Sequence, residues 1–569
     1  MFCLLLISSL SVDESLFNKL NIYQVMVSSF QDGDSGRGYR TGYGPSSHNG
    51  DLQGIINSLQ YIKDLGFNAI WMTPIFDSSN GAGGALLQST GYFATNYFKV
   101  DPKFGNEDTL RALVSKAHSL GLYVILDGVL GHHGGVRSAS PNGNWPQGGN
   151  DPVSYPGSLP FYKEVVQYWI NNFEIDGWRL DQCYQLYQNG HNYMKEIREA
   201  VYEVCDRRKS EGKQWGTLGY VVGEHWKGTD EINQQTYGQN GLVSAFDFPA
   251  RYNMVQGAAQ EESGAGGYGI QTFANIHRTP SEKGYPSNVF PNLFIDNHDL
   301  WRLGNLIRAK YGENQDSDRY WARHKMCIAA LAVYTGPITL YYGDEVGDLV
   351  ECWYGQGGAC GGNTYGDNCA RSDGHISGFN NRQQDLHDFT KKLMQARLEH
   401  PAMYRGTYGK TFNGNTYFNC KYDPQTGDKI VYVTTMNWDP TTVSYFVGGS
   451  QLVDLVTGER ISGNGGTYQI SLGTLGTRVF QVIENKNAYN NNKINDVVGF
   501  SSNGSATKEQ KKSKNVFIVV GCVCAALVVA IAVAVALFVK FHKKEEISSV
   551  DDHDPLLQNE NSAYTNLDK

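Results

Sequence analysis

Short apolar runs alternate regularly with longer amphipathic stretches over about 380 residues of this chain, and this pattern restricts the fold more than any other feature. Apolar runs of about four to eight residues are typical of buried strands, whereas apolar residues spaced by three or four positions are typical of helices. The alternation therefore predicts an α/β fold with a parallel sheet. The eight predicted strands are 22–28, 69–73, 123–127, 177–181, 220–224, 243–248, 293–296 and 338–342.

Helical stretches fall between these strands. Residues 51–65 place Ile55, Leu59 and Ile62 on one face, as an amphipathic helix does. The other predicted helices are 107–120, 161–173, 191–208, 321–333 and 386–398. Eight units of strand and helix predict a (β/α)8 TIM barrel, which we expect to be the catalytic domain, over residues 18–400.

Three further segments complete the expected domain organisation. The connection after the third strand, residues 131–159, is rich in Gly, Pro, Asn and Ser, and it predicts a short insertion that protrudes from the barrel. A C-terminal antiparallel β domain is expected over 401–485, and residues 486–514 are polar and predict a stalk. The β domain is predicted from short strands at 429–437, 442–447, 451–454 and 477–482.

Two apolar segments predict a membrane protein. Residues 516–539 form a run of 24 residues without charge, which is long enough to cross a bilayer as a transmembrane helix. Residues 1–12 resemble a secretory signal peptide. Together they predict a single-pass type I protein with a lumenal or extracellular barrel and a cytosolic tail at 540–569. Asn503 begins a glycosylation sequon in the stalk, which predicts a glycoprotein.

The predicted tail contains two patterns that resemble sorting signals. One runs from Asp552 to Leu557 and the other from Tyr564 to Leu567. Short extended peptides of this kind dock separate side chains into adaptor pockets. They predict binding to clathrin adaptors, and a location in endosomes, lysosomes or the plasma membrane.

Composition narrows the function classes. The net charge of −9 argues against a nucleic-acid partner, which usually requires a basic face. The chain is rich in aromatic residues, with 35 Tyr, 25 Phe and 10 Trp, and this suits sugar binding. Of ten cysteines, Cys352, Cys360 and Cys369 lie close together, and we expect one disulfide among them in an oxidising compartment.

Three carboxylates lie at or just beyond the ends of predicted strands: Asp181, Glu224 and Asp299. The carboxyl ends of barrel strands form the active face, so these side chains are expected to converge. Arg179 lies on the same strand face as Asp181. Asp127, His132 and His298 also follow strands.

This set of residues suits glycoside hydrolysis. One carboxylate must be ionised to attack the anomeric carbon, and a neighbouring arginine favours the ionised form. A second carboxylic acid must stay protonated so that it can protonate the leaving oxygen. For a single Asp, a structural ion pair would be the better explanation. For the whole set, in order at strand ends, catalysis is the better explanation.

Several segments resemble the α-amylase family, glycoside hydrolase family 13, across about residues 18–485. The family's four conserved regions resemble 127–132 (DGVLGH), 177–181 (GWRLD), 223–226 (GEHW) and 294–299 (FIDNHD). The resemblance implies a retaining enzyme that cleaves α-1,4-glucosidic bonds of starch, glycogen or maltooligosaccharides. It implies that Asp181 is the nucleophile, Glu224 the acid/base and Asp299 the stabiliser of the transition state. The implied substrate-binding residues are Tyr92, Asp127, His132, Arg179, His298, Asp367 and Arg371.

The chain departs from the family at three positions. Gly131 stands where many members carry an asparagine that binds calcium, and Tyr184 and Gln185 replace a common Lys-His pair. Calcium prefers several fixed oxygen ligands. No metal-binding residue is therefore assigned, and calcium, the cofactor that the family implies, is placed in doubt. We interpret Cys183 as a packed side chain rather than a reactive thiol.

Three alternatives remain open at this point. The same site suits an α-glucosidase or a transglycosylase, because these differ in loop shape and water access. A non-enzymatic glycoprotein of amino-acid transporters resembles the same family, but there the membrane span precedes the barrel. A glucan-binding receptor would bind sugar without turnover, and the intact carboxylates argue against it.

Overall fold

The computed structural model describes residues 11–41, 45–81, 83–350 and 370–484. Most of the predicted signal, the stalk, the predicted span at 516–539 and the tail lie outside these residues. Among the described residues, none of the helices has the length and apolar character that crossing a membrane requires.

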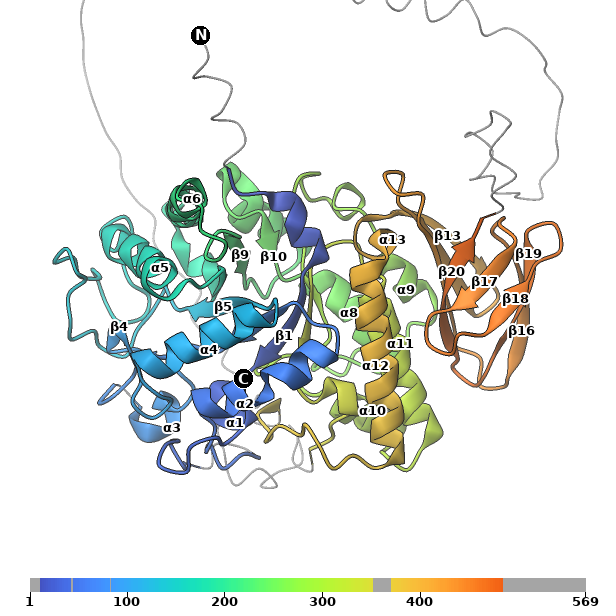
Figure 1. The fold of residues 1–569 in the computed structure, drawn as a ribbon, viewed down its shortest axis with the longest axis horizontal. Helices are drawn as coiled ribbons and strands as arrows, with labels where there is room; N and C mark the ends of the chain where they lie inside the picture. The colour runs from blue at the N-terminus through green and yellow to red at the C-terminus, as the bar shows by residue number, and fades with distance from the viewer. Residues whose placement is uncertain (1–10, 42–44, 82, 351–369, 485–569) are drawn as a thin grey trace, which may run out of the picture. The chain divides into compact units, whose positions relative to one another are not determined.

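Eight parallel strands form the central sheet, and all eight predicted strands are confirmed (Figure 1). Their order in the sheet is β10-β9-β6-β5-β2-β1-β12-β11. The first strand, β1, therefore lies between β2 and the last strand, β12. A parallel bridge between Phe246 and Asn292 joins the two edge strands, so the sheet closes as a TIM-like barrel. The strands are β1 (Asn21–Val25), β2 (Ala69–Met72), β5 (Tyr123–Gly128), β6 (Gly177–Leu180), β9 (Tyr220–Gly223), β10 (Ser244–Ala245), β11 (Leu293–Phe294) and β12 (Ile338–Tyr341).

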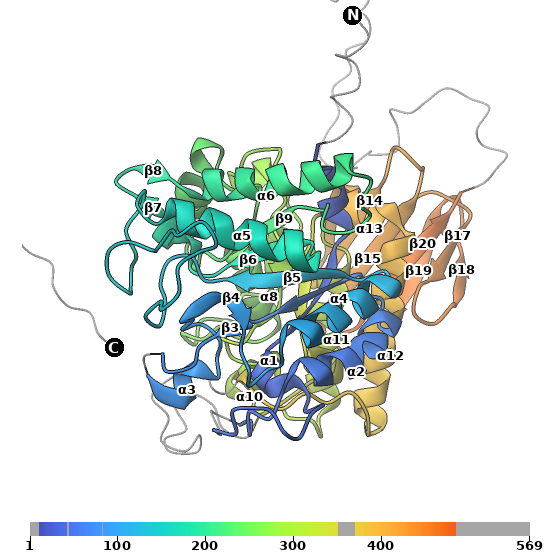
Figure 2. The ribbon, with the colours of Figure 1, turned by 60° about the vertical axis from the view of Figure 1, so that its left-hand side comes forward.

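Helices surround this sheet and bury their apolar faces on it (Figure 2). The α-helices of this region are α1 (Val27–Phe30), α2 (Leu52–Asp64), α3 (Gly84–Gln88), α4 (Glu107–Ser119), α5 (Leu159–Phe173), α6 (Met194–Ser210), α7 (Thr229–Glu231), α8 (Phe248–Ala258), α9 (Gln271–Ile276), α10 (Leu303–Tyr311), α11 (Asp318–Ala332), α12 (Asn381–Glu399) and α13 (Pro401–Arg405). Short 3-10 or π turns lie at Glu14–Lys19, Cys183–Leu186, Ile232–Tyr237, Gly238–Asn240, Ser281–Lys283 and Asp344–Val346.

Side-chain caps set where several helices begin. Asp51 accepts a hydrogen bond from the Gly54 amide at the start of α2, and Asn106 accepts one from Thr109 at the start of α4. Asn380 forms a capping box with Gln383 at the start of α12. The start predicted for the helix at 191 was wrong: residues 191–192 pair as a short strand, and α6 begins at Met194.

Short antiparallel ribbons decorate the barrel. They pair β3 (Phe76–Asp77) with β4 (Asn96–Val100), and β7 (Tyr187–Gln188) with β8 (His191–Asn192). The connection from β5 to α5 carries no helix or named strand, but the Val153 amide donates to the Gly131 carbonyl and the His133 amide donates to the Asn150 carbonyl. These bonds hold the connection beside the carboxyl end of β5.

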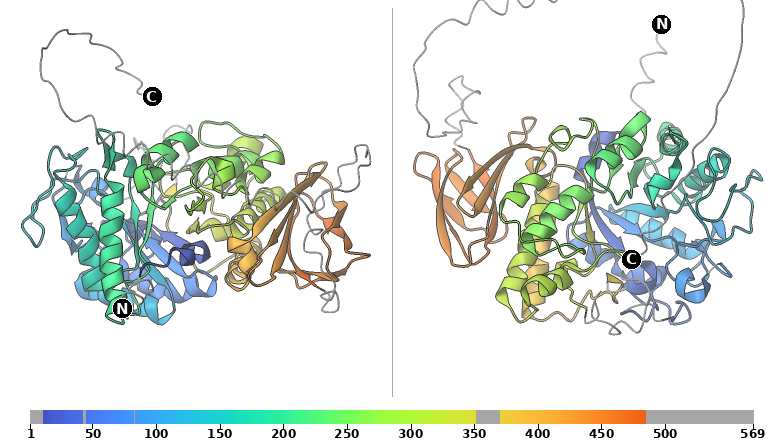
Figure 3. Two further views of the ribbon diagram at one scale, coloured as in Figure 1. Left: turned by 90° about the horizontal axis from the view of Figure 1, so that it is seen from above. Right: turned by 180° about the vertical axis from the view of Figure 1, so that it is seen from behind.

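An antiparallel β domain follows α13 and packs against α11 and α13. Its strands are the orange segments in Figure 3. A mixed core of Phe418, Val431, Leu452, Ile470 and Phe480 fills it. Its six-stranded sheet has the order β13-β14-β15-β20-β17-β18, and β16 pairs with β19. The strands are β13 (Thr407–Asn413), β14 (Thr416–Tyr422), β15 (Lys429–Thr435), β16 (Thr441–Phe446), β17 (Gln451–Asp454), β18 (Arg460–Ser462), β19 (Thr467–Leu472) and β20 (Thr477–Ile483).

The cysteines within the described residues form no disulfide: Cys183, Cys205, Cys327 and Cys420 are all free. The disulfide expected among Cys352, Cys360 and Cys369 lies outside the described residues. Cys183 is buried, and burial raises the pKa of its thiol to about 12. It is therefore a packed thiol rather than a nucleophile.

Candidate active site

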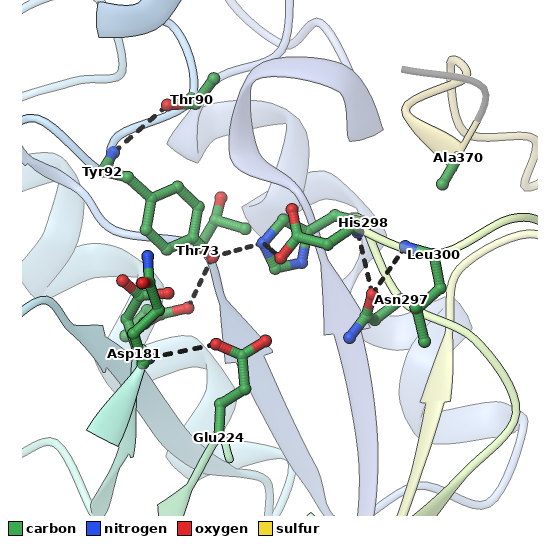
Figure 4. A network of polar contacts seen from close by, with 12 residues as sticks. Thr73, Thr90, Tyr92, Asp181, Glu224, Asn297, His298, Leu300 and Ala370 are labelled. Carbon is green, nitrogen blue, oxygen red and sulfur yellow. Dashed lines mark hydrogen bonds and ion pairs between the residues drawn. The ribbon is translucent and has the colours of Figure 1, made fainter. Parts of the chain in front are cut away.

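The barrel brings the predicted carboxylates together at the carboxyl ends of its strands. Asp181 follows β6, Glu224 follows β9, and Asp299 lies in the segment after β11. Figure 4 shows Asp181, Glu224, Tyr92 and His298 directed into one common space. This convergence follows from the parallel sheet, because the carboxyl ends of all its strands lie at one end of the barrel.

Arg179 contacts three carboxylates of the site, namely Asp181, Asp127 and Glu224. Its Nη1 donates to Asp181 Oδ1 at 2.9 Å and to Asp127 Oδ1 at 2.9 Å. Its Nη2 lies 2.9 Å from Glu224 Oε2. The guanidinium is fully buried, so these contacts are strong and depend little on salt. Two carboxylates that touch the same guanidinium are necessarily close to one another.

The two oxygens of Asp181 have different surroundings. Oδ1 is held by Arg179, whereas the buried Oδ2 has no hydrogen-bond partner among the residues that the structure describes. The His132 Nδ1 lies 3.7 Å from Oδ2. A carboxylate with one oxygen fixed and the other free is arranged to attack an electrophilic carbon.

The surroundings of Glu224 favour its protonated form. Burial raises the pKa of its carboxyl to about 8, and although Arg179 lowers it, the neighbouring Asp181 and Asp299 raise it further. The backbone amide of Gln182 donates to Oε2 at 3.1 Å and fixes the side chain. Glu224 therefore carries a proton at neutral pH, as a general acid must.

Asp299 stays ionised. Burial alone raises the pKa of Asp299, but His298, Arg371 and Arg179 lower it, and the balance is a pKa of about 2. The Arg371 Nη2 lies 2.9 Å from Asp299 Oδ1, and the His298 Nε2 lies 3.1 Å from Oδ2. The site therefore holds a fixed negative charge at this position.

Tyr92 and His298 form a stacked pair at the wall of the site. Their rings are nearly parallel, with centroids 5.3 Å apart. The Tyr92 hydroxyl lies 2.6 Å from His298 Nε2 and donates to Asp127 Oδ2 at 2.9 Å. Trp71 on β2 also donates to Asp127 Oδ2, at 3.2 Å. The phenol ring is thus held rigidly, as a platform for a sugar ring requires.

The residues around Gly131 do not fit the calcium ion that the family implies. A Cβ at position 131 would lie 1.9 Å from Gln185 Oε1, so the Gln185 side chain occupies the space of any side chain there. The Gln185 amide donates to Asp151 Oδ1 at 3.0 Å, and its Oε1 lies 3.4 Å from His132 Nδ1. The uncharged amide of Gln185 therefore fills the corner beside Gly131.

Two exposed aromatic residues lie near Glu224 in the sequence or in space. Trp226 is 42% exposed and stacks on Phe248, with ring centroids 5.6 Å apart. Tyr184 is 39% exposed and lies 5.6 Å from the His225 ring. Exposed rings whose other face is packed are suited to stack on sugars beyond the cleaved bond.

Nine of the ten predicted site residues lie within this cluster of contacts, and Asp367 lies outside the described residues. Sequence reasoning missed Trp71 and Gln24, which contact Asp127 and His298. A glutamine inside the apolar strand Asn21–Val25 is the signal that could have found Gln24, because a buried amide requires hydrogen-bond partners.

Comparisons with known proteins identify relatives over most of the barrel. The model of the family "Alpha amylase, catalytic domain" matches residues 24–140 and 160–406. A cyclomaltodextrinase of Geobacillus thermopakistaniensis is 25% identical in an alignment of 470 residues that covers 76% of this chain and 70% of the relative. An intracellular maltogenic amylase of Bacillus subtilis is 28% identical in an alignment of 330 residues that covers 52% of this chain and 49% of the relative.

Solved structures of related enzymes resemble this chain in fold. The crystal structure of AmyP in complex with maltose has a TM-score of 0.77 and 41% identity, and the match covers 84% of this chain and 98% of AmyP. An α-amylase from Geobacillus thermoleovorans, complexed with acarbose, has a TM-score of 0.63 at 22% identity, covering 83% of this chain and 99% of that enzyme, and it supports the fold alone. The curated relatives are enzymes, which sets aside the non-enzymatic glycoprotein.

The localisation expected from the sequence is corrected by these comparisons. We expected a single-pass type I membrane protein of endosomes, lysosomes or the plasma membrane. The maltogenic amylase relative is an intracellular enzyme by name, and the part of the chain that the structure describes contains no helix able to cross a membrane. The predicted span, the sequon and the patterns assigned to clathrin adaptors lie outside the described residues.

The family model and the structure both test the resemblance to the α-amylase family. The catalytic-domain match covers more than half of the chain and includes every segment on which the resemblance rested. The sheet order and the clustered acids agree with that match. This chain belongs to the α-amylase family and is a glycoside hydrolase.

Proposed function

We propose that this enzyme hydrolyses α-1,4-glucosidic bonds of starch, glycogen or maltooligosaccharides, with retention of the anomeric configuration. The observation that carries the proposal is the geometry of the two carboxyls on Arg179: Asp181 has one oxygen held and one free, and Glu224 lies 2.9 Å from the same guanidinium. Burial also raises the pKa of Glu224, which favours its protonated form. A retaining enzyme needs this pair, one ionised and one protonated, on either side of the bond.

In the first step, Asp181 Oδ2 attacks the anomeric carbon while Glu224 gives its proton to the leaving oxygen. The glycosidic bond breaks, and an ester bond forms between the sugar and Asp181. Arg179 donates a hydrogen bond to the other oxygen of Asp181 and so fixes the orientation of the carboxylate during attack. The negative charge of Asp299 stabilises the positive charge that develops on the ring.

In the second step, Glu224 is ionised and acts as a base. It removes a proton from a water molecule, the water oxygen attacks the anomeric carbon, and the ester bond to Asp181 breaks. Glu224 is then protonated again. Tyr92 stacks on the sugar at the cleavage point, and His132, His298 and Asp127 bind its hydroxyl groups. Asp367 and Arg371 hold the same or the next sugar.

The substrate class rests on chemistry and on the relatives. The half-exposed ring of Tyr184 lies near Glu224, where the leaving part of a glucan chain would pass, and Trp226 follows two residues after Glu224. The names of the relatives include a cyclomaltodextrinase and a maltogenic amylase, and AmyP was solved with maltose. We assign catalysis to residues 18–400, with the insertion at 131–159, and a supporting role to the β domain at 401–485.

Product analysis tests this function. The full chain is incubated with maltoheptaose and with glycogen, and the first products are followed by proton NMR. We expect α-anomers first, and product sizes that distinguish chain-internal from chain-end cleavage. Glu224→Gln should lower kcat by about 10²- to 10⁴-fold, because general acid catalysis contributes that much. Initial β-anomers, or an active Gln variant, would contradict the proposal. Transfer to added glucose at the expense of hydrolysis would favour the transglycosylase instead.

A further inference from the structure

Gln24 is a buried polar residue that the proposed chemistry does not use. It lies on β1, between β2 and β12, and its side chain is fully buried. Its Nε2 lies 2.9 Å from His298 Nδ1, and its Oε1 has no hydrogen-bond partner among the described residues. Burying an amide whose oxygen has no hydrogen-bond partner is unfavourable, so the contact between Gln24 and His298 needs an explanation.

The positions of the protons around Tyr92 explain the contact between Gln24 and His298. Asp127 already accepts hydrogen bonds from Arg179 on both oxygens and from Trp71, so it acts as an acceptor toward Tyr92. The single hydroxyl proton of Tyr92 therefore points at Asp127. The short contact of 2.6 Å between the Tyr92 oxygen and His298 Nε2 then requires the proton on Nε2.

A neutral His298 has only one ring proton. Burial lowers the pKa of His298 to about 3, Asp299 opposes this shift, and Arg179 and Arg371 add to it, so the ring is neutral at neutral pH. With its proton on Nε2, Nδ1 carries a lone pair that needs a donor. Among the residues that the structure describes, the amide nitrogen of Gln24 is the donor that lies within hydrogen-bond distance of Nδ1. The reverse orientation of the amide would place the proton on Nδ1. In that case Nε2 would carry a lone pair that faces the Asp299 Oδ2 oxygen at 3.1 Å, and the two acceptors would repel each other.

We propose that Gln24 is a positioning residue that holds His298 in its Nε2-protonated form. This proposal rests on the proposed function of the same site. The bond from Gln24 directs the Nε2 proton toward Tyr92 and Asp299, and so fixes the phenol ring and the charge that face the sugar. The unpaired Oε1 is the cost of that orientation.

Two substitutions of Gln24 in the full chain test the proposal. Gln24→Met keeps the length of the side chain but removes the donor, and we expect kcat/KM on maltoheptaose to fall about 10- to 100-fold, mainly through kcat. Gln24→Glu can donate the same bond as a neutral acid but not as a carboxylate. Its kcat should approach that of the unmodified enzyme at low pH and fall at a pH where the unmodified enzyme is still active. The charged and titratable groups around His298, namely Asp299, Arg371, Arg179 and Tyr92, are the same in all variants.

Asn21→Leu is the matched control. Asn21 is a buried amide on the same strand, and it donates to the carbonyls of Gly66 and Met394, away from the site. We expect it to lower thermal stability and to leave kcat unchanged. A Met variant within twofold of the unmodified kcat/KM, or a Glu variant with an unchanged pH profile, would overturn the proposal.

A direct measurement separates this proposal from the proposed function. NMR of the full chain with ¹⁵N-labelled histidine reports which ring nitrogen of His298 carries the proton, and His298→Gln assigns the signal. We expect protonation of Nε2 in the unmodified chain and a mixture in Gln24→Met. Protonation of Nδ1 in the unmodified chain would overturn the role of Gln24, whereas the absence of glucan hydrolysis would contradict only the proposed function.

Discussion

The pH dependence of hydrolysis should follow the proton on Glu224. Burial raises the pKa of this carboxyl to about 8, from an ordinary value of 4.5. At pH 7 a group with a pKa of about 8 is about nine-tenths protonated, whereas an ordinary glutamic acid is about 0.3% protonated. The surroundings of Glu224 thus increase the fraction of competent acid by about 300-fold at neutral pH.

The sign of the effect follows from this shift. A raised pKa keeps Glu224 protonated below about pH 8, and the acid is lost as the pH rises through that value. We expect kcat/KM on maltoheptaose, measured from pH 5 to pH 10, to fall on the alkaline side with a midpoint near 8. An alkaline midpoint near 5 would refute the argument.

A second substrate isolates the acid. The fluoride ion of α-maltosyl fluoride leaves without protonation, so formation of the ester on Asp181 no longer needs Glu224 as an acid. The alkaline fall should therefore be absent or much weaker for this substrate, and Glu224→Gln should retain far more of its activity on the fluoride than on maltoheptaose. An equal loss on both substrates would show that Glu224 acts in some other way.

Three further predictions concern other parts of the fold. Gly131→Ala places a Cβ against Gln185 and should destabilise the enzyme by about 1–3 kcal/mol in urea unfolding, and Gln185→Ala in the same chain should relieve most of this loss. A chelator should leave both activity and melting temperature unchanged, because Gln185 fills the corner at Gly131. A chelator-dependent loss would contradict this view of the corner. Asn380→Ala removes the cap of α12 and should lower stability by about 1 kcal/mol with kcat unaltered.

The barrel could be predicted because its signal is periodic and repeated. Each central strand is buried on both faces, so Ala69–Met72 and Tyr220–Gly223 appear as continuous apolar runs. The carboxylates at the strand ends could be placed for the same reason, since a parallel sheet fixes where its carboxyl ends lie. The positions of Asp181 and Glu224 on one guanidinium follow from that register.

The β domain was harder to predict because its strands carry polar residues. β14 contains Lys421, which is fully buried and donates to the carbonyls of Val333 and Met403 at the junction with the barrel. A lysine is typical of an exposed position, so Lys421 interrupts the apolar pattern of this strand. β13 has a similar difficulty, because Gly409 and Lys410 interrupt its alternation.

Contacts between distant segments could not be predicted from local patterns. Gln24 and His298 are 274 residues apart, and Gln185 meets the space at Gly131 only in the folded barrel. Such pairs depend on side-chain geometry, which a single sequence does not contain. A buried polar residue in an apolar strand is the one local sign that they leave.

Trapping of the covalent intermediate tests the central claim most directly. The full chain is treated with 5-fluoro-α-glucosyl fluoride, from which fluoride leaves as the ester forms, and the digested protein is analysed by mass spectrometry. The account predicts one added fluoroglucosyl group, on the peptide that contains Asp181, and none in Asp181→Asn. A label on another carboxylate, or turnover by a folded Asp181→Asn variant with its usual products, would contradict it.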